Sequence, residues 1–233
     1  MKRILLMLVL LMGVVTSAWA EKTPQAIWCR NNKTMYFTND ETVYAPGDTY
    51  DGETVTNVWN GVDVTNAIGH TLRRPLWVDV VSNSVLEVRF DPSFSDVRPV
   101  STESWFEDCR YLTSVEGLEY LNTSEVKRSL SMFYNCKSLT TLDVNSFDLR
   151  KVTVALAMFG NCENLVAIYC DNDWSEMFQE EQYIFCGCYK LKGSSHEPRS
   201  ARVDCKTRVE QSSACAAVGI ATLPNIVTEG YHW

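Results

Sequence analysis

Histidine is scarce in this chain, and basic residues are outnumbered by acidic ones. The chain has 233 residues, three histidines and a formal net charge of −8. His70, His196 and His232 show no metal-type spacing, so we predict no metal site and expect solvated imidazoles. An acidic chain repels phosphate, which argues against nucleic acid and anionic lipid surfaces as partners.

The motifs of several enzyme classes are also missing. The chain has no glycine-rich phosphate loop and no Gly-x-Ser-x-Gly elbow. Nothing in the sequence singles out two carboxylates for glycoside cleavage. Such pairs are brought together by folding and cannot be recognised from the sequence. We therefore predict a non-catalytic protein without a cofactor. An exported hydrolase that uses the repeats described below as an accessory platform is the alternative.

Long apolar runs are absent except at the N-terminus. Lys2 and Arg3 precede the apolar run 4–15, and Ala18-Trp19-Ala20 is a small-x-small cleavage signal. We predict that residues 1–20 are an export signal peptide and that no membrane span is left after its removal. Its loss takes the formal charge from −8 to −10, since both Lys2 and Arg3 go with it. Glu21 stands where a lipoprotein would need cysteine.

One phrase recurs, a cysteine followed three residues later by leucine. Its four copies begin at Cys109, Cys136, Cys162 and Cys188, in steps of 27, 26 and 26 residues. Self-similarity at this period, with leucines three apart, is typical of a leucine-rich repeat. One unit cannot bury its own apolar face, so neighbouring units are expected to stack.

The cysteine count is odd. Because there are nine cysteines, at least one is unpaired or pairs between molecules. The four repeat cysteines would stack about 4.8 Å apart, which is within disulfide reach, but their parallel Cβ vectors give the wrong torsion. We favour a ladder of buried free thiols that act as small apolar residues, with disulfides as the alternative.

Each unit is predicted to contain a strand, a turn and a helix. Residues 139–144 form the clearest strand. Val126, Leu130 and Phe133 lie at i, i+4 and i+7, and Val152, Leu156 and Phe159 repeat that helical spacing. The predicted fold is α/β: a short right-handed leucine-rich repeat solenoid with units of about 26 residues and a β-rich N-terminal cap.

Three regions follow the signal peptide: a β-rich N-terminal cap (21–100), the repeat array (101–193) and a C-terminal cap or loosely ordered tail (194–233). Residues 26–29 and 35–37 flank Asn31-Asn32-Lys33, which predicts a hairpin. Residues 86–90 alternate apolar and polar, as a half-buried strand does. Leu86 precedes Leu112 by 26 residues, so it is expected to begin a degenerate opening repeat.

The segment Ser131-Met132-Phe133-Tyr134-Asn135-Cys136-Lys137-Ser138-Leu139-Thr140-Thr141-Leu142-Asp143 resembles the unit of the BspA-like leucine-rich repeat surface proteins of gut and oral anaerobic bacteria. Their unit reads roughly Met-Phe-x-x-Cys-x-x-Leu-x-x-Leu-Asp. The match is good over about 85–193 and weaker over 21–84. The resemblance implies an exposed or secreted protein that binds host or microbial surface molecules in adhesion or coaggregation. It brings no family-wide catalytic residues.

A ligand face is predicted on the outward strand positions of the repeats. Its candidate residues are Thr113, Glu116, Thr141, Asp143 and Tyr169. This polar, mildly acidic set suits weak contact with a host or microbial surface protein or glycan. We expect a monomer at the cell surface or outside the cell, with the periplasm as an alternative location and a purely structural envelope role as a further one.

Overall fold

The structure is a computed structural model that describes residues 22–62, 74–170 and 183–191. The predicted signal peptide (1–20), the C-terminal region (194–233) and all three histidines lie outside the described residues. In the described part, no helix combines the length and the apolar character needed to cross a membrane.

An antiparallel hairpin begins the fold. β1 (Gln25–Cys29) pairs with β2 (Thr34–Thr38), which confirms the predicted hairpin. β5 (Asn57–Asn60) pairs antiparallel with the other edge of β1. In the chain between β2 and β5, β3 (Thr49–Tyr50) and β4 (Glu53–Thr54) form a small antiparallel ribbon. The backbone of its Asp51-Gly52 turn has positive φ at both residues, as a tight type I′ hairpin requires.

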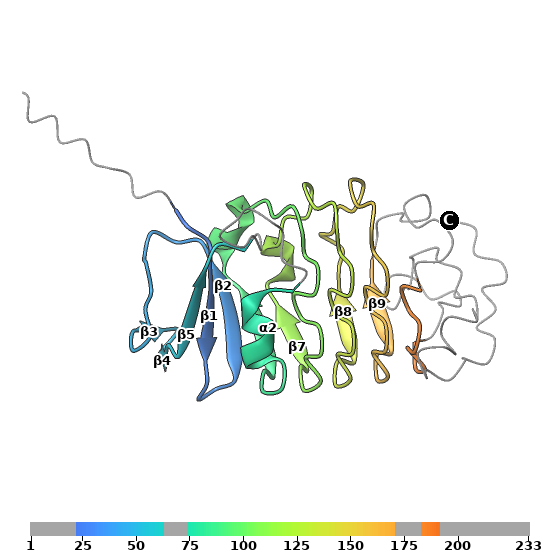
Figure 1. Cartoon of the computed structure of the whole chain (residues 1–233), viewed down its shortest axis with the longest axis horizontal. Helices are drawn as coiled ribbons and strands as arrows, with labels where there is room; N and C mark the ends of the chain where they lie inside the picture. Colours follow the sequence, from blue (N-terminus) through green and yellow to red (C-terminus); the bar gives the residue numbers. More distant parts are fainter. Residues whose placement is uncertain (1–21, 63–73, 171–182, 192–233) are drawn as a thin grey trace, which may run out of the picture.

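Parallel strands extend this sheet. β2 pairs with β6 (Glu87–Phe90), and β6 pairs with β7 (Ser114–Glu116), giving the order β5-β1-β2-β6-β7. A separate parallel pair, β8 (Thr141–Asp143) and β9 (Ala167–Tyr169), follows β7 along the molecule (Figure 1). The five-stranded sheet therefore runs across residue 100, where we placed the boundary between cap and repeats.

The predicted α/β leucine-rich repeat solenoid is wrong. The described residues contain one α-helix, the six-residue α2 (Leu76–Val81), and two short 3-10 helices, η1 (Pro92–Asp96) and η2 (Leu118–Tyr120). The strands form small sheets, of which the five-stranded one is mixed. No helix follows β8 or β9 where the chain is described. The supposed helix stripe also fails, since Leu156 is 40% exposed.

Left-handed residues explain why no helix forms in the repeats. The residue before each repeat cysteine has positive φ, with values of 64° at Asn135, 60° at Asn161 and 82° at Gly187. An α-helix of L-residues cannot contain this conformation without cost. The backbone instead bonds to the next unit: the N–H of Phe133 donates to the carbonyl of Met158 at 2.8 Å.

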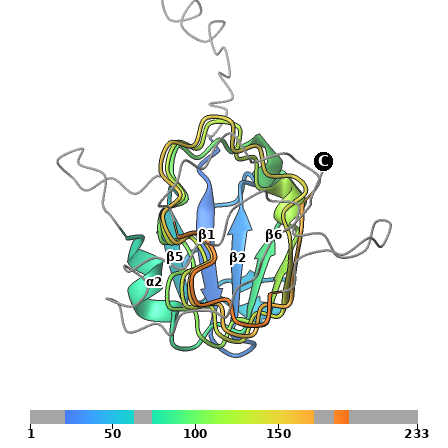
Figure 2. The same ribbon diagram turned by 90° about the vertical axis from the view of Figure 1, so that its right-hand side faces the viewer.

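The repeat units lie one upon another, and their traces overlie when seen end-on (Figure 2). Phe133 stacks on Phe159 at 5.7 Å between ring centroids, and Phe159 on Phe185 at 5.5 Å. Two further sets of buried or partly buried apolar residues repeat from unit to unit. The first is Val85, Leu112, Leu139, Leu165 and Leu191, and the second is Val88, Val115, Leu142 and Ile168.

The opening repeat starts one residue earlier than predicted. The N–H of Thr113 bonds to the carbonyl of Leu86, and Val88 pairs with Val115, so Val85 corresponds to Leu112. Val85 is fully buried, whereas Leu86 is 37% exposed.

Candidate functional site

The strongest candidate site lies on the outer side of the parallel strands. We call the outward row Arg89, Glu116, Asp143 and Tyr169 the strand face. Arg89 lies opposite Glu116 in the β6–β7 pair, and Asp143 lies opposite Tyr169 in the β8–β9 pair. The alternate residues point into the core, because side chains of a strand alternate between its two sides. The row is therefore held in place by a buried interior.

The sequence-predicted ligand residues fall on or next to this face. Glu116, Thr141 and Asp143 are exposed in β7 and β8, and Tyr169 is half-buried in β9. Thr113 is exposed immediately before β7, where its hydroxyl donates to the carbonyl of Leu86 at 2.9 Å. The structure thus brings Glu116, Asp143 and Tyr169 into one row and leaves Thr113 at its margin.

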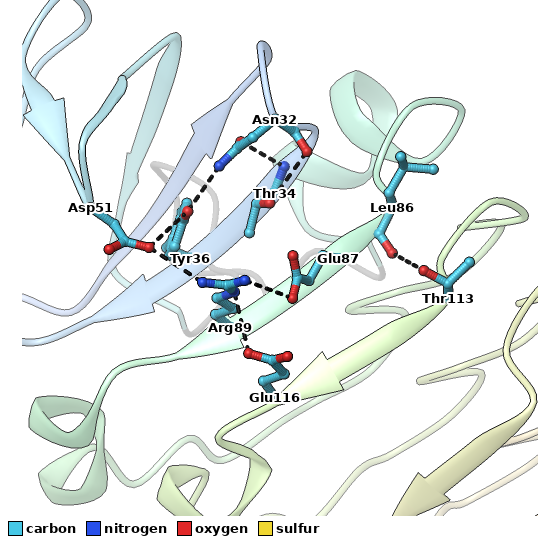
Figure 3. Close-up of polar contacts among 9 residues, drawn as sticks. All are labelled: Asn32, Thr34, Tyr36, Asp51, Leu86, Glu87, Arg89, Thr113 and Glu116. Atoms are coloured by element: carbon cyan, nitrogen blue, oxygen red, sulfur yellow. Dashed lines mark hydrogen bonds and ion pairs between the residues drawn. The ribbon is translucent and has the colours of Figure 1, made fainter.

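Arg89 is the residue that the sequence-based site missed. Its guanidinium lies 3.0 Å from a carboxylate oxygen of Glu87, 3.3 Å from one of Glu116 and 3.4 Å from one of Asp51 (Figure 3). The hydrogen bond to Glu87 is the main cause that raises the pKa of Arg89. The alternating segment 86–90 already placed Glu87 and Arg89 on one side of a strand. No sequence signal pointed to Asp51, which comes from a distant turn.

The β3–β4 ribbon closes one side of the strand face. It packs over the outer side of β1 and β2, where Ile27, Cys29, Tyr36 and Val55 form a second buried apolar cluster. The Tyr36 and Tyr50 rings are 5.0 Å apart, and the hydroxyl of Tyr36 donates to Asp51 at 3.2 Å. Burial raises the pKa of Tyr36. The outer side of the sheet is thus covered at β1 and β2 and exposed from Glu116 onward.

Negative charge dominates the exposed part. Asp51, Glu87, Glu116 and Asp143 surround or follow Arg89, and these five residues together carry a net charge of −3. No ion pair to Asp143 occurs among the described residues, where one of its oxygens accepts the N–H of Asn145 at 3.0 Å. Such a surface can attract a cationic group by electrostatic complementarity.

The four repeat cysteines occupy a different place, inside the molecule. Cys109, Cys136, Cys162 and Cys188 are free and buried. The thiols of Cys136, Cys162 and Cys188 donate to the carbonyls of Phe106, Phe133 and Phe159 at 3.2, 3.1 and 3.0 Å.

Burial raises the pKa of Cys109 and Cys136, which disfavours the reactive thiolate. These features suit a structural role. Cys186, which is not one of the four repeat cysteines, is disulfide-bonded.

The strand face and its surroundings suit a metal ion poorly. Among the residues that the structure describes, no group of three or more histidine, cysteine or carboxylate side chains could hold a metal ion. At Arg89, the guanidinium already lies among the carboxylates. What the strand face offers chemically is a fixed row of charges and one aromatic ring.

Comparison with known proteins gives one similarity. Residues 95–196 match a family model described as a Mycoplasma protein of unknown function, DUF285. The matched segment contains β7, β8 and β9 and all four repeat cysteines, and it is less than half of the chain. Comparison with curated proteins and with solved structures gave no significant match.

Proposed function

We propose that this is an exported, non-catalytic recognition protein that binds a protein or glycan at the bacterial surface. The observation that carries the proposal is the strand face, a polar row presented by consecutive strands above a buried core. Non-obligate interfaces are about as polar as ordinary protein surface, so this composition suits reversible contact. The proposal includes a monomer that acts without a cofactor.

Rigidity of the row supports recognition. Strands that pair in a sheet are about 4.8 Å apart, which fixes the spacing of Arg89 from Glu116 in β6–β7 and of Asp143 from Tyr169 in β8–β9. The ion pairs from Asp51, Glu87 and Glu116 fix the position of Arg89 before any partner arrives. Less side-chain entropy is then lost on binding.

Two features of the sequence support the proposed location. Residues 1–20 have the charged, apolar and small-residue order of an export signal. The repeat phrase resembles that of BspA-like surface proteins, which are linked to adhesion. We therefore propose the cell surface or the extracellular space as the site of action, with the periplasm as the alternative.

Two measurements test this function. Labelling of intact cells with a membrane-impermeant reagent should modify the protein if it is displayed at the surface. Purified protein should bind host matrix proteins or neighbouring bacterial cells in a pull-down. The charge reversals Glu116→Lys and Asp143→Lys should together weaken that binding, and Glu125→Lys, which changes a carboxylate outside the strand face, should not. Absence of binding by the wild-type protein would contradict the function, and equal binding by the double variant would exclude this face.

A further inference from the structure

Opposite charges join neighbouring units at several places, but Glu116 and Asp143 on the strand face have the same charge. Lys137 pairs with Glu163, and Lys151 pairs with Glu125, each across one repeat step of 26 residues. On the strand face, Glu116 and Asp143 occupy equivalent positions one unit apart, and both are carboxylates. β7 and β8 belong to separate sheets, so the two carboxylates are consecutive along the face without being a cross-strand pair.

Arg89 offsets the negative charge of Glu116 and Asp143 only in part. Arg89 contacts Glu116 through Nε at 3.3 Å, but the same guanidinium also pairs with Glu87 and Asp51. Asp143 lies a further repeat unit away from Arg89 and, in the described part of the chain, is in no ion pair. Among the described residues, Asp143 is therefore the carboxylate of the strand face whose charge no ion pair offsets, and Glu116 shares its cation with two other carboxylates.

An aromatic ring adjoins Asp143. Tyr169 lies opposite Asp143 in the β8–β9 register and is half-buried, so part of its side chain is accessible. A lysine or arginine that binds a carboxylate can lay its apolar stem, or its charge, against such a ring. Carboxylate and tyrosine side by side thus match the two parts of a long basic side chain.

We propose that the strand face docks a basic segment of a protein partner, with a lysine or arginine side chain held between Glu116 and Asp143 and packed on Tyr169. This inference rests on the proposed function and narrows its protein-or-glycan partner to a cationic protein. An acidic surface repels sulfated or sialylated glycans. In the row itself, only Tyr169 offers a ring on which a neutral sugar could stack.

The inference can be tested with three probes in a fluorescence anisotropy titration. They are a peptide of alternating lysine and glycine, its glutamate–glycine counterpart and a neutral dextran oligosaccharide. The wild-type protein should bind the lysine peptide and neither of the other two. Binding should weaken when salt is raised from 0.15 to 0.5 M, because added salt shortens the Debye length below its value of about 8 Å at 0.15 M and screens the charges further. Equal binding of both peptides, or preference for the oligosaccharide, would overturn the inference.

Paired variants locate the binding. Glu116→Gln with Asp143→Asn should lower affinity for the lysine peptide about fivefold, as expected for the loss of two exposed ion pairs. The side-chain amide introduced by Asp143→Asn keeps an oxygen that can accept the N–H of Asn145. Glu125→Gln with Glu163→Gln removes the same number of charges outside the strand face and should leave affinity within about twofold, since screening limits distant charges. An equal loss in both double variants would mean that only total charge matters and would overturn the inference.

The outcomes for this inference and for the proposed function are separable. Binding of wild-type protein to cells or matrix proteins, unaffected by Glu116→Gln with Asp143→Asn, would overturn the basic-segment inference and leave surface recognition standing. Failure of the wild-type protein to bind any cell or matrix protein would contradict surface recognition itself. Circular dichroism of each variant, with the wild-type unfolding midpoint as reference, shows that the comparison is made between folded proteins.

Discussion

At the scale of single residues, the position before each repeat cysteine decides the backbone path. Asp108, Asn135, Asn161 and Gly187 all have positive φ there, and these residue types tolerate that conformation best. The side chains also form a ladder, since the amide of Asn161 donates to Asn135 at 2.8 Å and that of Asn135 to Asp108 at 2.6 Å. Asn135 thus forms the turn of its own unit and links that unit to the units on both sides.

This ladder predicts different costs for two substitutions of Asn135. Asn135→Ala should lower the free energy of unfolding by about 2–3 kcal/mol, because it strains a left-handed residue and removes the hydrogen bonds of a buried amide to Asp108 and Asn161. Asn135→Gly should cost less, since glycine adopts positive φ freely. Urea unfolding of both variants measures the difference. If alanine were no worse than glycine, the left-handed backbone at this position would not be a constraint.

At the scale of elements, the strands of the repeats are only three residues long, so apolar packing must hold them. Leu142 in β8 is 3% exposed and lies in the second set of core residues. Its neighbours Thr141 and Asp143 are exposed. The alternation within one short strand therefore separates the core from the strand face.

We predict that Leu142→Ala lowers the free energy of unfolding by about 2–5 kcal/mol, as other core leucine truncations do. Thr141→Ala, on the exposed side of the same strand, serves as the control and should stay within about 0.5 kcal/mol of wild type. Denaturant unfolding measures both. A loss near zero for Leu142→Ala would show that this leucine does not carry core packing.

The cysteine ladder predicts a pattern of protection. In the native protein at pH 8, Cys109, Cys136, Cys162 and Cys188 should react slowly with an alkylating reagent, since all four are free and buried. In denaturant they should react fully. Differential alkylation with mass spectrometry identifies each site. Rapid native labelling of these four, or resistance to labelling in non-reducing denaturant, would contradict buried free thiols.

The sequence predicted some of these elements and not others. The hairpin and the strand at 87–90 follow from local turn residues and alternation, which act over a few positions. The helices were predicted wrongly, because the spacing of Val126 and Phe133 also fits a non-helical segment. This segment turns at Ser131 and Asn135, which both have positive φ. The first unit was misplaced by one residue, since Val85 rather than Leu86 fills the apolar position.

The candidate site was also predicted in part. The repeat frame alone placed Glu116, Asp143 and Tyr169 on outward strand positions. Arg89 was missed, because a frame that starts at Leu86 aligns it with the inward Val115 and not with Glu116, its partner in the sheet. Asp51 reaches the site through packing of the β3–β4 ribbon on Tyr36, a tertiary contact without a local signature.

At the scale of the whole molecule, an acidic chain carries several buried groups that resist ionisation. Burial raises the pKa of Cys29 to about 11, and it also raises the pKa values of Tyr36 and Tyr50. Cys29 and Tyr36 belong to the cluster beneath the β3–β4 ribbon, and Tyr50 of β3 packs against it. The unfolded chain would lose these protons at lower pH than the folded one.

Stability should therefore fall in alkali. Below about pH 8, a unit under the ordinary cysteine pKa of 9.0, the three groups are neutral in both states, so their burial is not opposed by ionisation. Between about pH 8 and about 11 the unfolded state binds fewer protons than the folded state, and the free energy of unfolding decreases as pH rises. Urea midpoints from pH 7 to 11 measure this fall, and Cys29→Ala should make it shallower. A constant midpoint up to pH 11 would contradict ionisable groups buried in this cluster.

If the strand face is the surface used for recognition, carboxylate footprinting should detect its protection by a bound partner. Protein alone and protein bound to its cellular or matrix target would be treated with a carbodiimide and an amine, and modified residues quantified by mass spectrometry. Binding should lower modification of Glu116 and Asp143 several-fold and leave that of Glu125 unchanged. Unchanged modification of Glu116 and Asp143, with protection elsewhere on the molecule, would contradict recognition through the strand face.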